Sequence, residues 1–229
     1  MRDPALEVLA GLVFACAARG AYSITHIVRP AIVSKCLAAL LGCSRDEQEQ
    51  IRLATAAHDV GKLAVPDALL SKPSALSDDE RLKMRSHSAV GASLFGGIRH
   101  PLLQVAATIA HYHHERYDGT GYPEHLNGAQ IPMPARIVAV ADVFDALTES
   151  RHYHAAMSDD QAAELIAQGA GTQFDPLVAE AFLGNFEAII SERNAADALI
   201  AQRSHQDILN DFFRFRLLAG GIEQGRTGT

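Results

Sequence analysis

The stretch AAHDVGKL, residues 56 to 63, places a histidine, an aspartate and a lysine inside an apolar run whose spacing predicts a helix. On a helix His58 and Lys62 lie one above the other at i and i+4, and Asp59 lies about 100° round from His58. All three side chains can therefore reach one small site. In a helix-lined interior such groups are costly unless a partner or a divalent cation compensates them. By themselves, these residues favour an ion pair between Asp59 and Lys62 beside a hydrogen-bonded histidine.

The composition is that of a folded domain without a strong overall electrostatic field. Of the 229 residues 48% are hydrophobic, and 20 Lys and Arg against 27 Asp and Glu give a net charge of −7. This balance argues against a long nucleic acid or an anionic membrane as a partner. Cys16, Cys36 and Cys43 form no C-x-x-C pair, which argues against a disulfide framework and a structural zinc site. We expect a cytoplasmic protein without a membrane anchor, because the N-terminal apolar run is too short to span a bilayer.

Apolar residues recur at helical spacing along most of the chain, which predicts an all-α fold. Ser44, Ser77 and Ser158 each precede acidic residues and are expected to cap helices. The irregular stretch 116–134 is expected to be a shaped functional loop. One or two amphipathic helices should follow residue 187. The other expected helical segments are 6–18, 32–42, 47–61, 77–95, 101–115, 134–150, 158–168 and 175–190.

A second group of histidines supports a metal site. His113 and His114 are adjacent and can point into one pocket from the end of a helix, whereas His111 lies off that direction. Asp142 and Asp145 share one face of a helix at i and i+3. Neutral imidazoles beside carboxylates are the ligands that a borderline transition metal prefers.

Two more histidines are unremarkable when taken singly. His87 lies in a charged stretch and alone is typical of a surface histidine, and nothing near His26 marks it as a ligand. The combination is more informative, because the HD pair, a later histidine, the HH pair and a buried aspartate fall on separate segments. A metal site explains all of them together, whereas structural roles would have to be found for each.

Five strings occur in order along the chain: HDVGK (58–62), KPSALSDDERLKMRSH (72–87), HHERYDGTGYP (113–123), IPMPARIVAVADVFDALT (131–148) and GTQFDP (171–176). With these strings in order, the sequence resembles the HD-GYP family, a branch of the HD metal-dependent phosphohydrolases. The resemblance implies an all-α, HD-superfamily helical bundle with a metal site between helices. It also implies two or three metals, commonly iron or manganese, and hydrolysis of the bacterial messenger cyclic di-GMP.

The resemblance assigns roles to individual positions. Asp59 would bridge the metals, and Lys62 would face the phosphate and stabilise the charge that develops in the transition state. Gly121, Tyr122 and Pro123 would form the signature loop, which shapes the site or contacts protein partners such as diguanylate cyclases. The implied metal ligands are His26, His58, Asp59, His87, His113, His114 and Asp142.

The chain departs from the family pattern at two places. Tyr22 stands where members with a third metal carry a glutamate, so we expect two divalent ions. His154 and Ala155 replace a basic pair that contacts the nucleotide, which weakens the expected affinity for cyclic di-GMP. Asp145 and Arg151 remain as expected substrate contacts.

The sequence thus predicts an N-terminal helix over 1–20, a catalytic HD-GYP domain over 21–187, and a C-terminal helical extension and tail over 188–229. The expected activity is hydrolysis of cyclic di-GMP to linear pGpG or GMP. Two alternatives stay open: a catalytically weak signalling module that acts through protein partners, and a phosphohydrolase for another nucleotide. The apolar helix at 6–18 and the segment DFFRFRLL (211–218) could form a homodimer interface or pack on their own core.

Overall fold

The computed structural model describes residues 3–20, 23–149 and 156–213. In these ranges every regular element is a helix, and pairing of β type is limited to two isolated bridges. The prediction of an all-α fold is therefore confirmed. The helices are α1 (Pro4–Ala18), α2 (Ile24–Leu40), α3 (Arg45–Thr55), the 3-10 helix η1 (Val60–Ala64), α4 (Asp67–Leu70), α5 (Asp78–Leu94), α6 (Pro101–Tyr112), the 3-10 helix η2 (Gly128–Gln130), α7 (Met133–Thr148), α8 (Asp159–Gln168), α9 (Pro176–Gly184), α10 (Phe186–Ala201) and α11 (His205–Phe212).

The predicted N-caps are confirmed. Ser44, Ser77 and Ser158 precede α3, α5 and α8, and each side chain accepts a hydrogen bond from the backbone N–H three residues on. In return, the Glu or Gln at that third position accepts from the backbone N–H of the serine, which completes a capping box. These boxes fix where three of the helices begin.

The HDVGK segment is not helical in the expected way, and the prediction of one helix through Gly61 is wrong. α3 ends at Thr55, turns follow, and the chain then enters η1. The carbonyl of Thr55 accepts from both the backbone N–H (3.1 Å) and the Nδ1 (2.7 Å) of His58, so it does not continue the α-helical pattern. In the tighter 3-10 geometry side chains three residues apart lie in line, and Lys62 therefore pairs with Asp59.

The expected helix over 175–190 is also divided. α9 ends at Gly184 and α10 begins at Phe186, because Asn185 takes a non-helical conformation (φ −127°, ψ 24°). The Asn185 side-chain amide donates to the carbonyl of Ala181 (3.0 Å) and so satisfies one of the free carbonyls at the end of α9.

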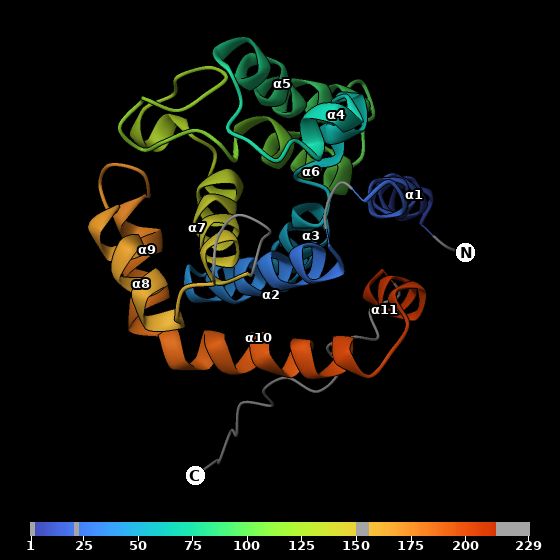
Figure 1. Ribbon diagram of the computed structural model, residues 1–229. Coiled ribbons are helices and arrows are strands. Elements are labelled where there is room, and N and C mark those ends of the chain that lie inside the picture. Colours follow the sequence, from blue (N-terminus) through green and yellow to red (C-terminus); the bar gives the residue numbers. More distant parts are fainter. Residues whose placement is uncertain (1–2, 21–22, 150–155, 214–229) are drawn as a thin grey trace.

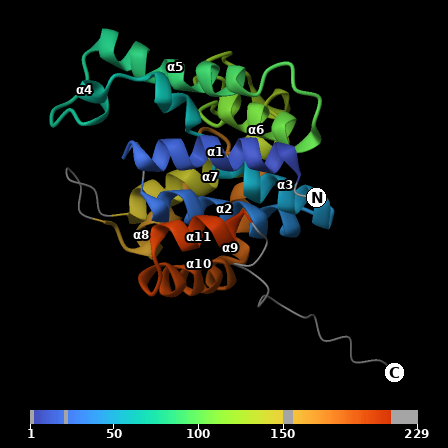
Figure 2. The same cartoon turned by 90° about the vertical axis from the view of Figure 1, so that its right-hand side faces the viewer.

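Helix α2 is central to the packing. α3, α7 and α10 all pack against it, and α10 runs beneath it in Figure 1. α5 and α6 pack on each other in the layer above, and Figure 2 shows α1 lying between that layer and α2. One apolar core joins α1, α2, α3, α6 and α11, and a second joins α2 with α7 to α10.

The two terminal helices contribute to the first core. Leu9 and Val13 of α1 and Ile208 and Phe212 of α11 are buried in it. Packing on the protein's own core thus accounts for the apolar faces of α1 and α11, and residues 214–218 of the DFFRFRLL segment lie outside the described part of the chain.

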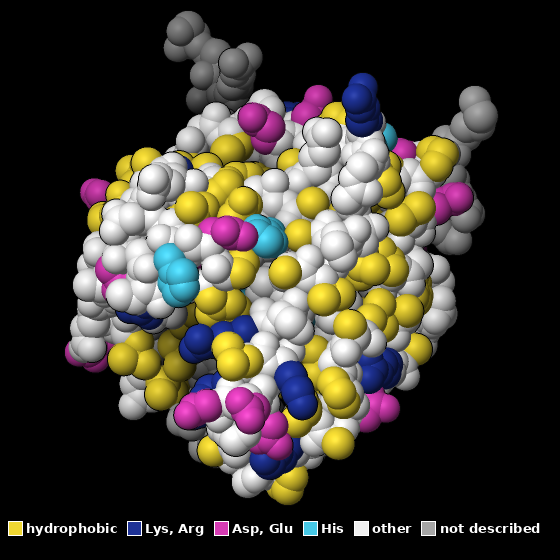
Figure 3. Space-filling model, turned by 90° about the horizontal axis from the view of Figure 1, so that it is seen from above, with side chains coloured by type: hydrophobic (Ala, Val, Ile, Leu, Met, Phe, Trp, Pro, Cys, Tyr) yellow, Lys and Arg dark blue, Asp and Glu magenta, His cyan; other side chains and the backbone are white. Residues whose placement is uncertain are grey.

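The outer surface is mixed in character. On the face drawn in Figure 3, Lys and Arg side chains are interspersed with Asp and Glu and with apolar side chains. Within the described ranges, no helix has both the length and the apolar content that crossing a bilayer requires.

Gly61 provides a test of how closely η1 approaches α5. A Cβ at this position would lie 1.8 Å from the carbonyl oxygen of His87, so Gly61→Ala must push backbone apart. We expect it to lower the free energy of unfolding by about 3 kcal/mol. The matched control is Gly11→Ala in α1, where a Cβ would meet nothing within 4 Å; it should raise stability by about 0.5–1 kcal/mol. Urea titrations measure both, and wild-type stability in Gly61→Ala would contradict the close packing.

Candidate metal centre

The structure brings all seven predicted metal ligands together between α2, α5, α6 and α7. His26 lies in the first turn of α2, and His58 and Asp59 lie in the turn before η1. The remaining ligands come from the middle of α5, the end of α6 and the middle of α7; they are His87, His113, His114 and Asp142. His87 is only 2% exposed, so the expectation of a surface histidine, which rested on that residue alone, is wrong.

The first cluster consists of His26, His58, Asp59 and Asp142. The Nε2 atoms of His26 and His58 lie 3.7 and 3.4 Å from Asp59 Oδ2. They lie 3.7 and 3.6 Å from Asp142 Oδ1. Donors this close suit a shared cation, since metal–ligand bonds of about 2.1 Å place tetrahedral neighbours about 3.4 Å apart.

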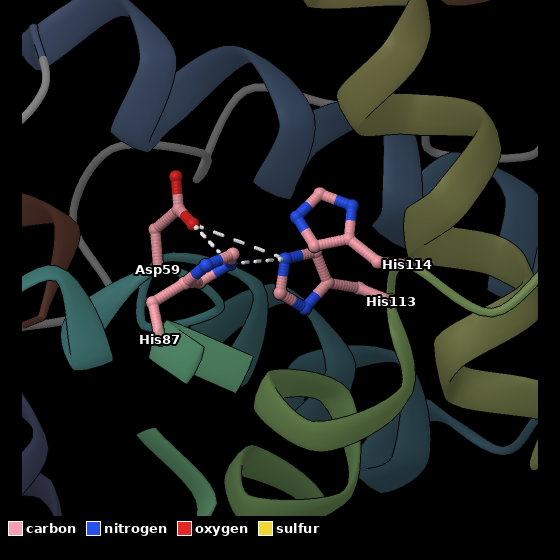
Figure 4. Close-up of side chains that lie close together, drawn as sticks. All are labelled: Asp59, His87, His113 and His114. Atoms are coloured by element: carbon pink, nitrogen blue, oxygen red, sulfur yellow. Dashed lines mark hydrogen bonds and ion pairs between the residues drawn. The ribbon is translucent and has the colours of Figure 1, made fainter. Parts of the chain in front are cut away.

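The second cluster consists of Asp59, His87, His113 and His114 (Figure 4). Asp59 Oδ1 lies 3.2 Å from His87 Nε2 and 3.8 Å from His113 Nε2, and those two nitrogens are 3.4 Å apart. One donor atom from each of the four residues lies within 4.8 Å of all the others. The two oxygens of Asp59 thus face different clusters, which is the geometry a bridging carboxylate needs.

Hydrogen bonds at Nδ1 orient four of the imidazoles. In each case Nδ1 is occupied by a carbonyl or a carboxylate, which leaves Nε2 to point into a cluster. The pairs are His58 with Thr55 O (2.7 Å), His87 with Met84 O (2.6 Å), His113 with Ile109 O (3.0 Å) and His26 with Asp145 Oδ2 (2.7 Å).

Unsatisfied buried atoms show that the clusters fit a cation. His58 Nε2 and Asp59 Oδ1 are buried, and no described residue offers either of them a hydrogen bond of good geometry. Buried polar atoms are almost always satisfied in proteins. A divalent metal would satisfy both, and imidazole with carboxylate oxygen is a donor set for first-row transition metals. The clusters therefore form a candidate metal centre.

Protonation also favours metal binding in the second cluster. Burial lowers the pKa of His114 to about 4, and burial together with the neighbouring His114 holds the pKa of His113 well below its usual range. Burial alone would raise the pKa of Asp59, but Lys62 and His58 outweigh it and hold that pKa well below its usual range. At neutral pH His113 and His114 are uncharged donors beside the ionised carboxylate of Asp59.

His26 differs because carboxylates surround it. Burial opposes its protonation, but hydrogen bonds to Asp145 and Asp59 outweigh burial and raise the pKa of His26 to about 10. A cation that binds at Nε2 must therefore displace a proton.

Asp145, which we predicted to contact the substrate, is 1% exposed, and its Oδ2 meets His26 Nδ1. Burial raises the pKa of Asp145. This geometry favours a role in orienting His26 over direct contact with a substrate.

Sequence reasoning missed Glu149, one turn after Asp145. Its Oε1 accepts from the hydroxyls of Ser23 (2.6 Å) and Thr25 (2.7 Å) and so ties the end of α7 to the start of α2. The i, i+4 spacing from Asp145 on one helix face was the signal that could have found it. The other expected substrate contact, Arg151, lies outside the described residues, as do Tyr22, Tyr153, His154 and Ala155.

Lys62 and the signature loop border the clusters. Lys62 Nζ donates to Asp59 Oδ2, and the lysine side chain is 23% exposed, so it lies between the buried carboxylate and solvent. The Tyr122 ring stacks on His114 with centroids 4.8 Å apart, and the Arg85 guanidinium carbon lies 4.9 Å from the Tyr122 centroid. Burial, and next the charge of Asp59, raise the pKa of Tyr122.

The backbone of the signature loop is held from inside. The Glu115 carboxylate accepts from the backbone N–H groups of Glu124 (2.7 Å) and Leu126 (3.2 Å). A Cβ at Gly121 would lie 2.3 Å from the backbone nitrogen of Arg116, so only glycine fits this close approach. These contacts keep Tyr122 against His114.

Comparison with known proteins gives a family and a set of relatives. The HD domain family matches residues 17–178. The cyclic di-GMP phosphodiesterase response regulator RpfG of Xanthomonas campestris pv. campestris is 40% identical over 195 residues, which are 84% of this chain and 52% of that protein. The 3′3′-cGAMP-specific phosphodiesterase 2 of Vibrio cholerae is 37% identical over 193 residues, 84% of this chain and 37% of that protein. The chain thus spans about half or less of the length of these relatives.

Solved structures share the fold. The crystal structure of a cyclic GMP-AMP-specific phosphodiesterase of Vibrio cholerae, V-cGAP3, matches with a TM-score of 0.63 over 90% of this chain and 53% of that chain, at 21% identity. An HDGYP protein from Bdellovibrio bacteriovorus matches with a TM-score of 0.57 over 72% of this chain and 53% of that chain, at 20% identity.

Asp59→Asn tests whether one carboxylate serves both clusters. We expect the variant to lose bound metal almost completely, because an amide supplies neither the charge nor the two equivalent oxygens. Wild-type protein should gain about 2.7 kcal/mol of stability from a cation at 100 times its Kd, and Asp59→Asn should gain almost none. Elemental analysis and thermal melts with and without Mn²⁺ measure this. Asp160→Asn, at an exposed position on α8, is the matched control; full metal content in Asp59→Asn would contradict the bridging assignment.

Proposed function

Because the chain belongs to the HD domain family, in its HD-GYP branch, we propose that it is a metal-dependent phosphodiesterase that hydrolyses cyclic di-GMP to linear pGpG or GMP. The observation that carries the proposal is the position of Asp59, with one oxygen toward each histidine cluster and Lys62 on its solvent side. An arrangement of this kind holds two cations next to each other and leaves a positive side chain where an anionic substrate would enter.

Two divalent ions, iron or manganese, are the proposed cofactors. His26, His58 and Asp142 would hold one, His87, His113 and His114 the other, and Asp59 both. Bound there, they would neutralise phosphate oxygens and lower the pKa of a water molecule. His113 and His114 supply neutral nitrogen donors, and His26, His58, Asp59, His87 and His113 are buried.

Lys62 is the proposed catalytic cation. Its Nζ is anchored by Asp59 and its side chain is 23% exposed, so it can meet a phosphate oxygen without leaving the carboxylate. A fixed ammonium group is more effective than a solvated one because it pays no reorganisation as negative charge develops. Lys62 is therefore assigned to transition-state stabilisation and Asp59 to holding both Lys62 and the cations.

A second substrate is proposed because of the relatives. One relative that covers 84% of this chain is named a 3′3′-cGAMP-specific phosphodiesterase. Cyclic GMP-AMP has the same phosphodiester ring and differs in one base, so the same clusters could act on it. His154 and Ala155 in place of the basic pair fit a changed base preference.

The remaining assignments concern organisation and partners. We take residues 21–187 as the catalytic region, between the N-terminal helix and the C-terminal extension, in a cytoplasmic protein. Protein partners such as diguanylate cyclases would meet the signature loop at its outer residues; Glu124 and His125 are exposed there. A homodimer is a further, separate proposal.

The activity is tested by product analysis. Protein purified without oxygen is incubated with cyclic di-GMP or 3′3′-cGAMP and either Fe²⁺ or Mn²⁺, and the products are separated by chromatography. We expect linear dinucleotide or mononucleotide with about two metals per chain, a stoichiometry set by the paired clusters, and no product from Asp59→Asn. Metal without turnover of either nucleotide would instead support the binding-module alternative.

Lys62→Ala separates catalysis from metal binding. We expect near-normal metal content, since lysine is no ligand, and a rate about 100-fold lower, the usual effect of removing one electrostatic stabiliser. Initial rates with cyclic di-GMP and with bis(p-nitrophenyl) phosphate provide the measurement. Lys72→Ala, which removes a half-buried lysine paired with Glu80, is the matched control and should keep the wild-type rate. Equal rates for Lys62→Ala and wild type would remove Lys62 from the mechanism.

A further inference from the structure

Arg19, at the end of α1, binds the backbone that carries Lys62. Its Nη1 donates to the carbonyl oxygens of Lys62 (3.0 Å) and Leu63 (2.6 Å), and its Nη2 donates to the carbonyl of Val65 (2.6 Å). Its Nε donates to Asp67 Oδ1 (2.8 Å). One guanidinium therefore gathers three carbonyls and a carboxylate from a single stretch of chain more than forty residues away in sequence.

These carbonyls lie at the C-terminal end of η1, where a helix leaves its last carbonyls without internal partners. A planar guanidinium offers five N–H donors in fixed directions and can serve several of them at once. A lysine ammonium is a compact point charge with three donors, and it cannot reach three carbonyls and a carboxylate at once. Arg19 thus acts as a side-chain cap supplied by a different helix.

The capped segment determines where Lys62 stands. The backbone N–H of Lys62 donates to the carbonyl of Asp59 (2.9 Å), and its own carbonyl is held by Arg19 and by the N–H of Val65 (3.0 Å). Its side chain is anchored only at Nζ, on Asp59. Arg19 is accordingly the contact that fixes the far side of the Lys62 backbone.

The rest of α1 contacts the same segment. α1 packs against η1, and the thiol of Cys16 lies 3.6 Å from the carbonyl of Val60. α1 is beneath α4 and α5 in Figure 2 and is anchored in the first core through Leu9 and Val13. Because α1 lies outside every string that carries the family resemblance, nothing in those strings assigns it a part in the site.

We propose that Arg19 is a positioning residue for Lys62, and that α1 thereby forms part of the catalytic machinery. This proposal rests on the proposed function, because it depends on the role given there to Lys62. Arg19 touches neither cluster. It acts by keeping η1 in the place that lets Lys62 reach both Asp59 and a bound phosphate.

A double-mutant cycle tests the proposal. Arg19→Ala should lower kcat for cyclic di-GMP about 10- to 100-fold, the effect of a misplacement of roughly 1 Å, and leave KM and metal content close to wild type. In the Lys62→Ala background Arg19→Ala should cause no further loss. The proposal would be overturned if Arg19→Ala lowered kcat by the same factor in the Lys62→Ala background as in the wild-type background. An unchanged kcat in Arg19→Ala would overturn it as well.

Hydrogen exchange supplies a readout that does not need activity. In Arg19→Ala the amides of Lys62 and Val65 should exchange at least tenfold faster than in wild type, because the segment opens locally, while amides in α7 keep wild-type rates. Wild-type protection of these two amides would overturn the positioning role. If the wild-type chain hydrolyses neither nucleotide, the proposed function fails while this measurement still decides the role of Arg19.

Three further variants separate positioning from loss of folding. Arg19→Lys keeps the charge and should fall between wild type and Arg19→Ala. Asp67→Asn removes the carboxylate partner, which is 79% exposed, leaves the carbonyl contacts, and should change kcat by no more than about twofold. Arg81→Ala removes a comparable exposed ion pair on α5 and should match wild type. If Arg19→Lys kept the wild-type kcat while Asp67→Asn lost most of it, charge pairing alone would matter. That result would overturn the capping argument.

Discussion

The carboxylate of Asp59 imposes the constraint on which this fold depends. It is 3% exposed and yet ionised, and isolated buried charges of this kind are not tolerated. Lys62 compensates this charge, and imidazoles from four different segments face the two oxygens. The donors must approach from different directions to reach two oxygens, so no single helix can provide them. Helices α2, α5 and α6 each bring a donor to this point, and the apolar cores on either side hold the helices in place.

The local break after α3 follows from the same constraint. Continuing the α-helix would keep His58 and Lys62 on one face and turn Asp59 aside. The turn and η1 instead let His58 enter one cluster while Asp59 faces both and Lys62 folds back onto it. The approach of η1 to α5 is possible because residue 61 has no side chain. The α-helical pattern gives way to turns over residues 56–59 and then to η1, and Asp59 gains Lys62 as a partner in return.

Much of this could be read from the sequence, for reasons that differ between features. The capping boxes at Ser44, Ser77 and Ser158 are local and need only a few residues to be recognised. The convergence of the histidines came from the family resemblance, because spacing within one helix carries no information about other helices. The break at Thr55 could not be foreseen, because the segment that follows it packs against α5 through Gly61 and His87, which are 26 residues apart. The contact of Asp145 with His26 could not be foreseen for a related reason, because the two residues lie on different helices.

Contacts outside the clusters connect them to both ends of the chain. On one side α1 reaches η1 through Arg19. On the other side, Asp197 of α10 forms a bidentate ion pair with Arg29 (2.7 and 2.9 Å). The Nη1 of Arg29 lies 3.9 Å from Asp145 Oδ1, and Asp145 in turn orients His26. Charge-assisted contacts in a largely buried setting keep their direction better than exposed ones. His26 and Lys62 are therefore each connected to a helix that the ligand motifs do not include. It follows that the geometry of the centre depends on α1 and α10 as well as on the helices that carry the two clusters.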